Sequence, residues 1–142
     1  MEDPIRQRIA TKALIVNPEG KLLIVREAVT YADSTQRGKY TFPGGRIDPG
    51  EPHLEGLMRE ITEETGLRVK VGRPLFVEEW FPTINDERNH IVAIYFQCEP
   101  LTQDVRLSDE HDHFEWVTPG EMAAYELKGP KPEMIASLLT AN

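Results

Sequence analysis

The sequence predicts an α/β protein in which a mixed β-sheet lies between helices. Strand patterns occur on both sides of a central helix pattern at residues 52–66, and two further helix patterns follow the last strand pattern. The length of 142 residues suits one domain with a sizeable core, so we expect residues 1–142 to form a single domain.

The N-terminal part of the chain predicts a pair of strands. Residues 9–17 and 21–26 are apolar runs of strand-forming side chains, and Pro18-Glu19-Gly20 between them is a turn signal. We therefore expect a β-hairpin here. Residues 28–39 are polar and contain Gly38, which favours a mobile loop before the central helix.

The part that follows the central helix predicts four more strands, at residues 68–71, 75–81, 90–99 and 114–117. We expect Gly72-Arg73-Pro74 to turn the chain between the first two, and residues 82–89 to form a hairpin loop. The run 90–99 is apolar on both faces for most of its length, which is typical of a central strand.

The C-terminal segment predicts two helices. Thr118-Pro119-Gly120-Glu121 is a capping box with proline at the first helical position, and we expect its helix to end near Leu127. Gly129-Pro130-Lys131-Pro132 then breaks the helix. An apolar stripe at helical spacing predicts the last helix and consists of Met134, Ile135, Leu138 and Leu139.

Composition excludes several classes of protein. The net charge of −8 argues against a broad nucleic-acid-binding surface, because such surfaces carry a basic patch. The sequence has no apolar stretch long enough to span a membrane and no N-terminal signal pattern, so we expect no membrane association and a cytoplasmic protein. The single cysteine, Cys98, sits in an apolar run and is expected to be a buried hydrophobe rather than a nucleophile.

The most informative stretch of the chain carries Glu60, Glu63 and Glu64 at positions i, i+3 and i+4. On an α-helix this spacing brings the three carboxylates within about one turn of each other on one face. Like charges so placed repel each other and destabilise a bare helix, and a bound cation would remove that repulsion. Carboxylate oxygens suit the hard divalent ions Mg²⁺ and Mn²⁺.

The helix itself has independent support. Pro52 fits its first position and Gly66 its end. We expect its core-facing stripe to lie opposite the glutamates and to comprise Leu54, Leu57, Met58, Ile61 and Thr65. Gly56 falls on the carboxylate face, one turn before Glu60. A glycine inside a helix costs about 1 kcal/mol relative to alanine, and the close approach of a loop or ligand would explain it.

Residues 45–67 resemble the Nudix box, whose pattern is G-x5-E-x7-R-E-U-x-E-E-x-G-U with U a bulky aliphatic residue. The chain matches all nine fixed positions, with Gly45, Glu51, Arg59, Glu60, Ile61, Glu63, Glu64, Gly66 and Leu67. The preceding run from Tyr40 to Gly44 resembles the W-x-x-P-G lead-in of the family, with tyrosine in the place of tryptophan. The resemblance implies the Nudix fold, an α/β/α sandwich.

The resemblance also implies a metal-dependent hydrolase that cleaves a nucleoside diphosphate linked to another moiety. Water attacks a phosphorus of the pyrophosphate, with Mg²⁺ or Mn²⁺ as cofactor and two or more ions expected. The expected metal ligands are Glu60, Glu63, Glu64 and the Gly45 carbonyl. Arg59 is expected to orient the catalytic glutamates together with Glu51, which is itself at most an occasional ligand.

The general base has two candidates. Some Nudix proteins use a glutamate of the box, and others use an acidic residue in the loop before the last strand. Here Glu64 represents the first possibility and Glu110, in the acidic loop before residues 114–117, represents the second. We favour Glu64 as both ligand and base, while a solvated acidic loop remains the ordinary explanation for Glu110.

Three residues outside the box are candidates for substrate binding. Arg26 ends a predicted strand near the polar loop and is the best candidate for a phosphate contact, and Arg46 adds positive charge beside the box. The alternative for both is plain solubility. Trp80, with Phe81, lies at the rim of a strand and offers a ring that can stack on a nucleobase, with edge packing as the alternative.

The substrate is the least determined part of the prediction. The small size of the chain, with no added N-terminal domain, favours a compact hydrolase that converts a (deoxy)nucleoside triphosphate into the monophosphate and pyrophosphate. ADP-ribose or another nucleotide sugar is the main alternative, followed by dinucleoside polyphosphates and the 5′ end of RNA, the last disfavoured by the net charge.

Two alternative classes of protein and the oligomeric state are also considered. The intact set of three glutamates argues against a non-catalytic nucleotide-sensing domain. A short chain without an evident catalytic cysteine motif argues against an isopentenyl diphosphate isomerase-like enzyme. The expected partner is a small nucleotide, with a homodimer left open.

Overall fold

The long strands of the chain form a mixed β-sheet. The computed structural model describes residues 4–28, 38–127 and 129–139, which form eight strands, two α-helices and one 3₁₀ helix. In the larger sheet the strand order is β4-β1-β7-β5, with β6 beside β7. Its strands are β1 (Ile5–Ile15), β4 (Gly44–Arg46), β5 (Val69–Trp80), β6 (Thr83–Ile84) and β7 (Glu87–Pro100).

Strand β7 lies at the centre of this sheet, as its two apolar faces predict. It pairs in parallel with β1 from Ile5↔Arg88 to Ile15↔Cys98 and antiparallel with β5 on its other edge. Strand β4 pairs antiparallel with β1. Parallel and antiparallel pairs therefore share one sheet, which confirms the predicted α/β class.

The predicted hairpin between residues 9–17 and 21–26 is wrong. The second of these runs becomes β2 (Leu22–Glu27), which belongs to a separate sheet of order β3-β2-β8 with β3 (Tyr40–Thr41) and β8 (His111–Val117). A single bridge, Val16↔Leu22, joins the end of β1 to the start of β2 within the described residues. Strand β1 pairs along its full length with β7 instead, which is distant in the sequence. The local turn signal at residues 18–20 does not predict this pairing.

The predicted turn at Gly72-Arg73-Pro74 is also wrong. Strand β5 continues through these residues, and its register with β7 shifts on either side of Pro74. A Cβ atom on Gly72 would lie 2.8 Å from the carbonyl oxygen of Gln97. The Gly72-Arg73-Pro74 segment therefore produces a bulge in a continuous strand, with Gly72 allowing the close approach of the two backbones.

Several strand boundaries differ from the prediction by a few residues. Strand β1 begins at Ile5 because β7 extends far enough to pair with it there. Strand β8 begins at His111, where it pairs with Glu27. A hairpin forms within the loop predicted at residues 82–89, but the loop is shorter than predicted because Thr83–Ile84 pairs with the start of β7. The chain turns at Asn85 and Asp86, both of which have positive φ angles.

The central helix forms where the sequence predicts it. Helix α1 (His53–Thr65) follows Pro52 and ends at Gly66, whose φ of 72° is left-handed and whose N–H bonds to Thr62. Leu57, Ile61 and Thr65 are buried, but the predicted core positions Leu54 and Met58 are exposed. The helix therefore buries a narrower stripe than predicted.

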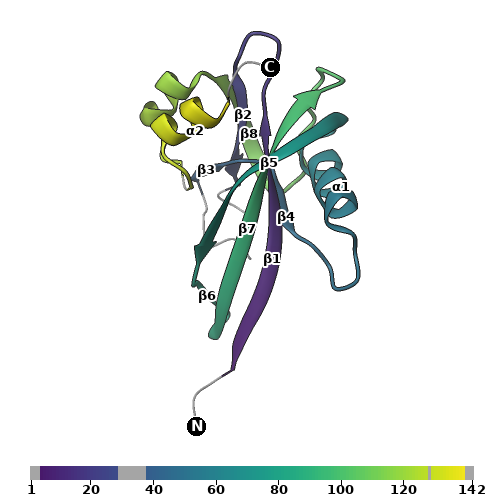
Figure 1. Ribbon diagram of the computed structural model, residues 1–142, viewed down its shortest axis with the longest axis vertical. Coiled ribbons are helices and arrows are strands. Elements are labelled where there is room, and N and C mark those ends of the chain that lie inside the picture. The colour runs from purple at the N-terminus through teal and green to yellow at the C-terminus, as the bar shows by residue number, and fades with distance from the viewer. Residues whose placement is uncertain (1–3, 29–37, 128, 140–142) are drawn as a thin grey trace.

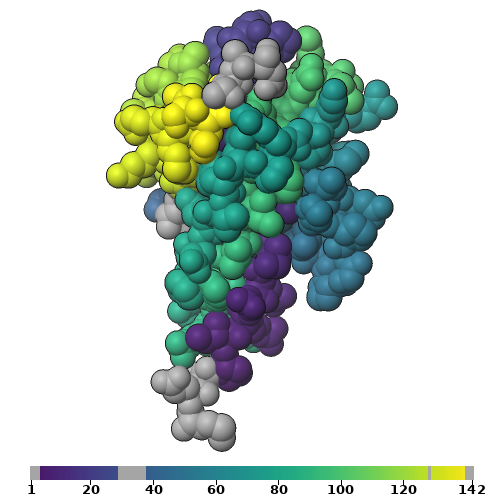
Figure 2. Space-filling view, in the orientation of Figure 1, coloured from purple at the N-terminus to yellow at the C-terminus, as the bar shows by residue number. Residues whose placement is uncertain are grey.

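The C-terminal helices lie on the other side of the long strands (Figure 1). Element η1 (Pro119–Ala124) is a short 3₁₀ helix that opens with the predicted capping box of Thr118 and Glu121 but ends before Leu127. Helix α2 (Pro132–Leu138) follows the predicted break. In the space-filling view, α1 in blue and α2 in yellow stand on opposite flanks of the molecule (Figure 2).

Two apolar cores hold these layers together. One core packs Leu57 and Ile61 of α1 against β1, β2 and β7, and the other includes Met122 of η1 and Ile135 of α2. The buried thiol of Cys98 belongs to the first of these, as predicted. No helix within the described ranges 4–28, 38–127 and 129–139 is long and apolar enough to cross a membrane. Most of the mobile loop predicted at 28–39 (residues 29–37) lies outside those ranges.

Candidate active site

Two glycines bring the backbone of β4 against the carboxylates of α1. Gly44 has a φ of 132°, and a Cβ there would lie 2.2 Å from the carbonyl oxygen of Thr11, so only glycine fits. Its N–H donates a 2.8 Å hydrogen bond to Oε2 of Glu64. A Cβ on Gly45 would lie 3.2 Å from the carboxylate of Glu60. The glycines therefore let the strand lie directly on the acidic face of the helix.

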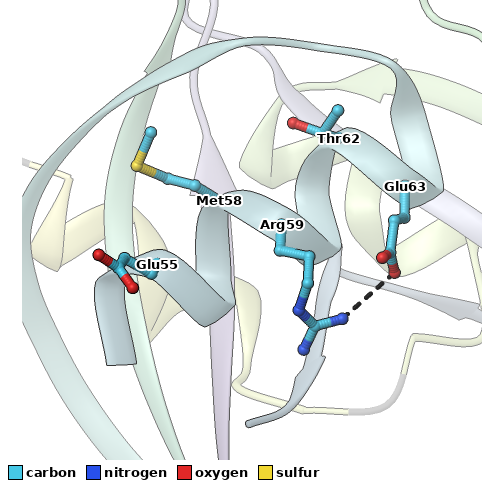
Figure 3. A pocket seen from close by; sticks show the side chains of 5 residues that line it. All are labelled: Glu55, Met58, Arg59, Thr62 and Glu63. Carbon is cyan, nitrogen blue, oxygen red and sulfur yellow. Dashed lines mark hydrogen bonds and ion pairs between the residues drawn. The ribbon is translucent and has the colours of Figure 1, made fainter. Parts of the chain in front are cut away.

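Arg59 connects several carboxylates of the site. Its guanidinium donates two hydrogen bonds to Glu51, at 2.8 and 3.0 Å, and its Nη1 donates to Glu60 at 3.1 Å. The same nitrogen reaches Glu63 at 3.3 Å, as Figure 3 shows. The hydrogen bonds from Arg59 lower the pKa of Glu51 to about 2, with a further contribution from the N–H of Asp48. Arg59 thus holds the acidic groups of loop and helix in one arrangement.

The loop between β4 and α1 packs onto the helix at Gly56. A Cβ at this position would lie 2.6 Å from Cγ2 of Ile47 and 2.9 Å from Oε1 of Glu51. The prediction that a loop approaches the helix at this turn is therefore confirmed. The glycine makes room for the carboxylate that Arg59 holds.

The three helix glutamates differ strongly in exposure. The side chain of Glu63 is 59% exposed, whereas Glu64 is only 6% exposed as a residue and lies inside the fold. The prediction that all three point away from the core is therefore wrong for Glu64. The reason is that Gly44 of β4, His111 at the start of β8 and the loop before β8 lie against the last turn of the helix, so that Glu64 is enclosed although it lies off the apolar stripe.

Burial has electrostatic consequences for Glu64. Desolvation raises the pKa of Glu64 to about 8, against the opposing effects of Lys12 and the Gly44 N–H. Burial lowers the pKa of Lys12, whose Nζ donates a 3.2 Å hydrogen bond to Thr41. Burial also raises the pKa of Glu60, and the nearby Glu63 and Glu110 carboxylates add to that effect.

Folding places Glu110 beside the helix carboxylates. One ligand atom each of Glu64, Glu110 and His111 lies within 4.8 Å of the other two. Nε2 of the buried His111 is 3.6 Å from Oε1 of Glu64. The Glu110 backbone is fixed by the Ala28 N–H, which donates to its carbonyl at 2.8 Å.

Lys12 and His111 are absent from the predicted site residues. Lys12 stands alone in an apolar strand pattern, and His111 stands in an acidic loop, so neither local pattern predicts a place beside Glu64. Desolvation and the neighbouring Lys12 lower the pKa of His111 to about 4. Both residues reach the site through strands that pair only in the folded protein.

The predicted substrate contacts are spread over the two sheets. Arg26 of β2 forms an ion pair with Asp112 at 2.7 Å, next to His111. Arg46 is exposed at the end of β4 and pairs with Ala10. Trp80 ends β5, and its register partner is Ile91, which is itself opposite Arg8 of β1. Because opposite residues in a sheet share a face, Trp80 and Arg8 lie on the same face of the larger sheet. Arg8 is on β1, the strand next to β4, whereas Trp80 is on β5, three strands away from β4.

The outer face of α1 carries an open pocket (Figure 3) beside the carboxylate cluster, which consists of Glu60, Glu63, Glu64 and Glu110. Its lining consists of Glu55, Met58, Arg59, Thr62 and Glu63. Arg59 and Glu63 belong to both features. The pocket therefore lies on the solvent side of the same helix.

The donor chemistry of the cluster fits hard divalent cations. Carboxylates of Glu60, Glu63, Glu64 and Glu110 lie close enough to influence one another, and the pKa values of Glu60 and Glu64 are raised, mainly by burial. Oxygen ligands in such number are those that Mg²⁺ and Mn²⁺ prefer.

The comparison with known proteins agrees with this geometry. A family model described as the NUDIX domain matches residues 6–138. The chain belongs to the Nudix family. It is therefore a hydrolase of that family, and the nine matched positions of its Nudix box run from β4 through the loop and helix α1 to the two residues after the helix.

Relatives of this Nudix chain come from several organisms. A MutT-like protein from Streptomyces ambofaciens is 30% identical over 120 residues, which are 84% of this chain and 70% of the relative. A CTP pyrophosphohydrolase from Escherichia coli (strain K12) is 27% identical over 119 residues, 84% of this chain and 82% of the relative. The crystal structure of a MutT protein from Methanosarcina mazei Go1 has a TM-score of 0.78 at 27% identity and covers 96% of both chains. The predicted Nudix fold is thus confirmed.

Proposed function

We propose that this Nudix hydrolase cleaves the pyrophosphate linkage of a (deoxy)nucleoside triphosphate, releasing the nucleoside monophosphate and pyrophosphate, with Mg²⁺ or Mn²⁺ as cofactor. The observation that carries the proposal is the meeting of the box glutamates with Glu110 beside the backbone of β4. The Escherichia coli relative, named as a CTP pyrophosphohydrolase, supports a triphosphate substrate.

The proposed metal ligands are Glu60, Glu63 and Glu64 with the carbonyl of Gly45, and two or more ions suit this number of carboxylates. When bound, such ions neutralise phosphate charge, lower the pKa of water and align the attacking and leaving groups. Arg59 and the Gly44 N–H orient these ligands, because both donate hydrogen bonds to the glutamates.

Glu64 is the proposed general base. Burial raises its pKa to about 8, so that it holds a proton more strongly than an exposed carboxylate does. The Gly44 N–H occupies Oε2, which leaves Oε1 facing the cluster formed with Glu110 and His111. Glu110 is exposed and is the alternative base.

The substrate contacts proposed are Arg26 and Arg46 for phosphate groups and Trp80 for the base. Arg26 forms an ion pair with Asp112, the residue that follows His111 in β8. Arg46 directly follows Gly45 on β4. Trp80 is partly exposed on β5, where its ring is open to stacking.

A phosphate-release screen tests this proposal. The protein is incubated with nucleoside triphosphates, ADP-ribose, other nucleotide sugars and dinucleoside polyphosphates, and a coupled pyrophosphatase or phosphatase reports the products. We expect the highest rate with a triphosphate, loss of activity with EDTA and its return with Mg²⁺ or Mn²⁺. A higher kcat/KM on ADP-ribose would move the assignment to a nucleotide-sugar pyrophosphatase, and full turnover in excess chelator would overturn the metal mechanism.

A matched pair of helix variants sharpens the screen. Glu63→Gln removes a proposed ligand, and we expect it to lower kcat/KM by about 10²–10³-fold, the scale of a lost transition-state interaction of several kcal/mol. Glu55→Gln removes an exposed charge from the same helix outside the carboxylate cluster and is expected to keep the activity. Equal losses in both variants would show a general effect of helix charge.

A further inference from the structure

His111 is a buried imidazole without an evident structural role. The residue is 6% exposed, and its Nδ1 is buried with no hydrogen-bond partner in the described part of the chain. Its other nitrogen, Nε2, lies 3.6 Å from Oε1 of Glu64, which is too long for a hydrogen bond. A metal ion at Nε2, the ring nitrogen measured near Glu64, would give the imidazole a bonding partner on that side of the ring.

The position of the ring relative to two carboxylates points to a metal. Ligand atoms of His111, Glu64 and Glu110 all lie within 4.8 Å of one another. Atoms that share one ion lie at most about 4–5 Å apart, because each is about 2.0–2.6 Å from it. Glu110 is exposed, so the cluster opens to solvent on that side and an ion can enter.

The identity of the donors decides which ion suits the cluster. Mg²⁺ prefers an all-oxygen environment, whereas an imidazole nitrogen favours transition metals. Mn²⁺ accepts carboxylates and also binds nitrogen more strongly than Mg²⁺ does. A set of two carboxylates and one imidazole therefore favours Mn²⁺ over Mg²⁺, whereas the glutamates alone suit both ions.

We propose that His111 is a nitrogen ligand of a bound metal ion, shared with Glu64 and Glu110, and that this ligand makes the site prefer Mn²⁺ over Mg²⁺. The proposal rests on the proposed metal use of the enzyme and adds a ligand from β8 to it. His111 reaches the site because β8 pairs with β2, and its backbone N–H is fixed by Ser108 at 3.2 Å.

Pulsed electron paramagnetic resonance of the Mn²⁺-loaded full chain tests the ligand directly, independently of turnover. We expect nitrogen modulation in the wild-type spectrum, a change in that modulation when the protein is labelled with ¹⁵N-histidine, and its loss in His111→Gln. The control is His113→Gln, because His113 is an exposed residue of the same strand that bonds to Glu115 at 2.9 Å. This variant should keep the signal.

Metal titration provides the second readout. His111→Gln should weaken Mn²⁺ binding by about 10–100-fold and change Mg²⁺ binding much less, so the ratio of the two affinities falls. The wild-type spectrum needs no variant to fold, which keeps the proposal testable if His111→Gln is unstable. Bound Mn²⁺ without nitrogen modulation in wild-type protein, or modulation that persists in His111→Gln, would overturn the proposal.

The two proposals fail in different ways. Nucleotide hydrolysis with Mg²⁺ but no nitrogen coupling to Mn²⁺ overturns the His111 ligand alone. Failure of the protein to bind either ion overturns the His111 ligand and the metal mechanism of the proposed function together. Mn²⁺ with nitrogen coupling but no turnover of any nucleotide in the screen overturns the substrate assignment and supports the ligand.

Discussion

Arg59 donates two hydrogen bonds to Glu51, at 2.8 and 3.0 Å, and so ties helix α1 to the loop that precedes it. The fork shape of a guanidinium suits this pairing, and the third nitrogen stays available for Glu60 and Glu63. The contact joins two parts of the Nudix box, the loop before α1 and the helix itself.

The first prediction concerns replacement of the Arg59 guanidinium. Arg59→Lys keeps the charge but loses the paired geometry, so we expect kcat/KM to fall by about 10–100-fold in steady-state kinetics. Arg68→Lys, at an exposed arginine just beyond the helix, is the control and should behave as wild type. An Arg59→Lys enzyme with unchanged kcat/KM would show that a single charge is sufficient at this position.

The second prediction concerns Gly56. An alanine inside a helix normally stabilises it relative to glycine by about 0.5–1 kcal/mol. At Gly56 the added Cβ would meet Ile47 and Glu51 at 2.6 and 2.9 Å, so we expect Gly56→Ala to lower both the melting temperature and the activity. Gly56→Leu should impair activity more strongly.

The chain offers a matched control for that substitution. Gly120 in η1 has an ordinary φ, and a Cβ there would meet Thr118 at a relaxed 3.9 Å. Gly120→Ala should therefore leave melting temperature and activity close to wild type. A Gly56→Ala protein that is more stable than wild type and fully active would mean that the loop shifts freely and the glycine is incidental.

The third prediction separates the two candidate bases. Glu64→Gln should lower kcat by about 10²–10⁴-fold with little change in KM, as expected for loss of a ligand that also takes a proton. Glu110→Gln should cost about tenfold or less if Glu64 is the base, because Glu60, Glu63 and Glu64 would still hold the metal. A larger loss in Glu110→Gln than in Glu64→Gln would reverse the assignment.

The folded state of these variants needs its own measurement, because Glu64 is buried. Glutamine has nearly the same shape, and its side-chain oxygen still accepts a hydrogen bond from the Gly44 N–H. We therefore expect a native circular dichroism spectrum for Glu64→Gln. An unfolded spectrum would assign Glu64 a structural role, and its kinetics would then carry no information on catalysis.

The fourth prediction tests the proposed base contact. Trp80→Ala should raise KM several-fold with little change in kcat, because stacking on a base is worth about 1–3 kcal/mol and acts before the chemical step. Phe81→Ala is the neighbouring control, since the Phe81 ring stacks on His90 at 4.4 Å instead. Equal KM values for Trp80→Ala and wild type would contradict the contact.

The fifth prediction concerns Cys98. Burial raises the pKa of its thiol to about 12, so the reactive thiolate is scarce at pH 8 and the sulfur is shielded from reagents. A thiol reagent such as DTNB should leave the native protein unlabelled at pH 8 and label one thiol per chain in denaturant. Rapid labelling of the native protein would indicate frequent opening of the core around α1.

The sequence by itself determined the helix and the Nudix box, and it predicts a class of metal. Helix α1 follows from spacing at 3.6 residues per turn together with Pro52 and Gly66, and these are local signals within a few residues. The close approach at Gly56 followed from the same local reasoning, because a glycine on a charged helix face needs a packing reason. The expectation of a hard cation followed from the chemistry of three carboxylates.

Only the tertiary structure decided which strands pair and which groups join the glutamates. Strand β1 pairs with the distant β7 and not with its sequence neighbour β2. Strand β2 pairs with β8 instead, and this pairing brings Glu110 and His111 to Glu64. Burial of Glu64 likewise depends on β4 and β8 covering the end of α1. These outcomes are set by contacts between segments far apart along the chain, where the pairing energy of whole strands outweighs any local turn or periodicity signal.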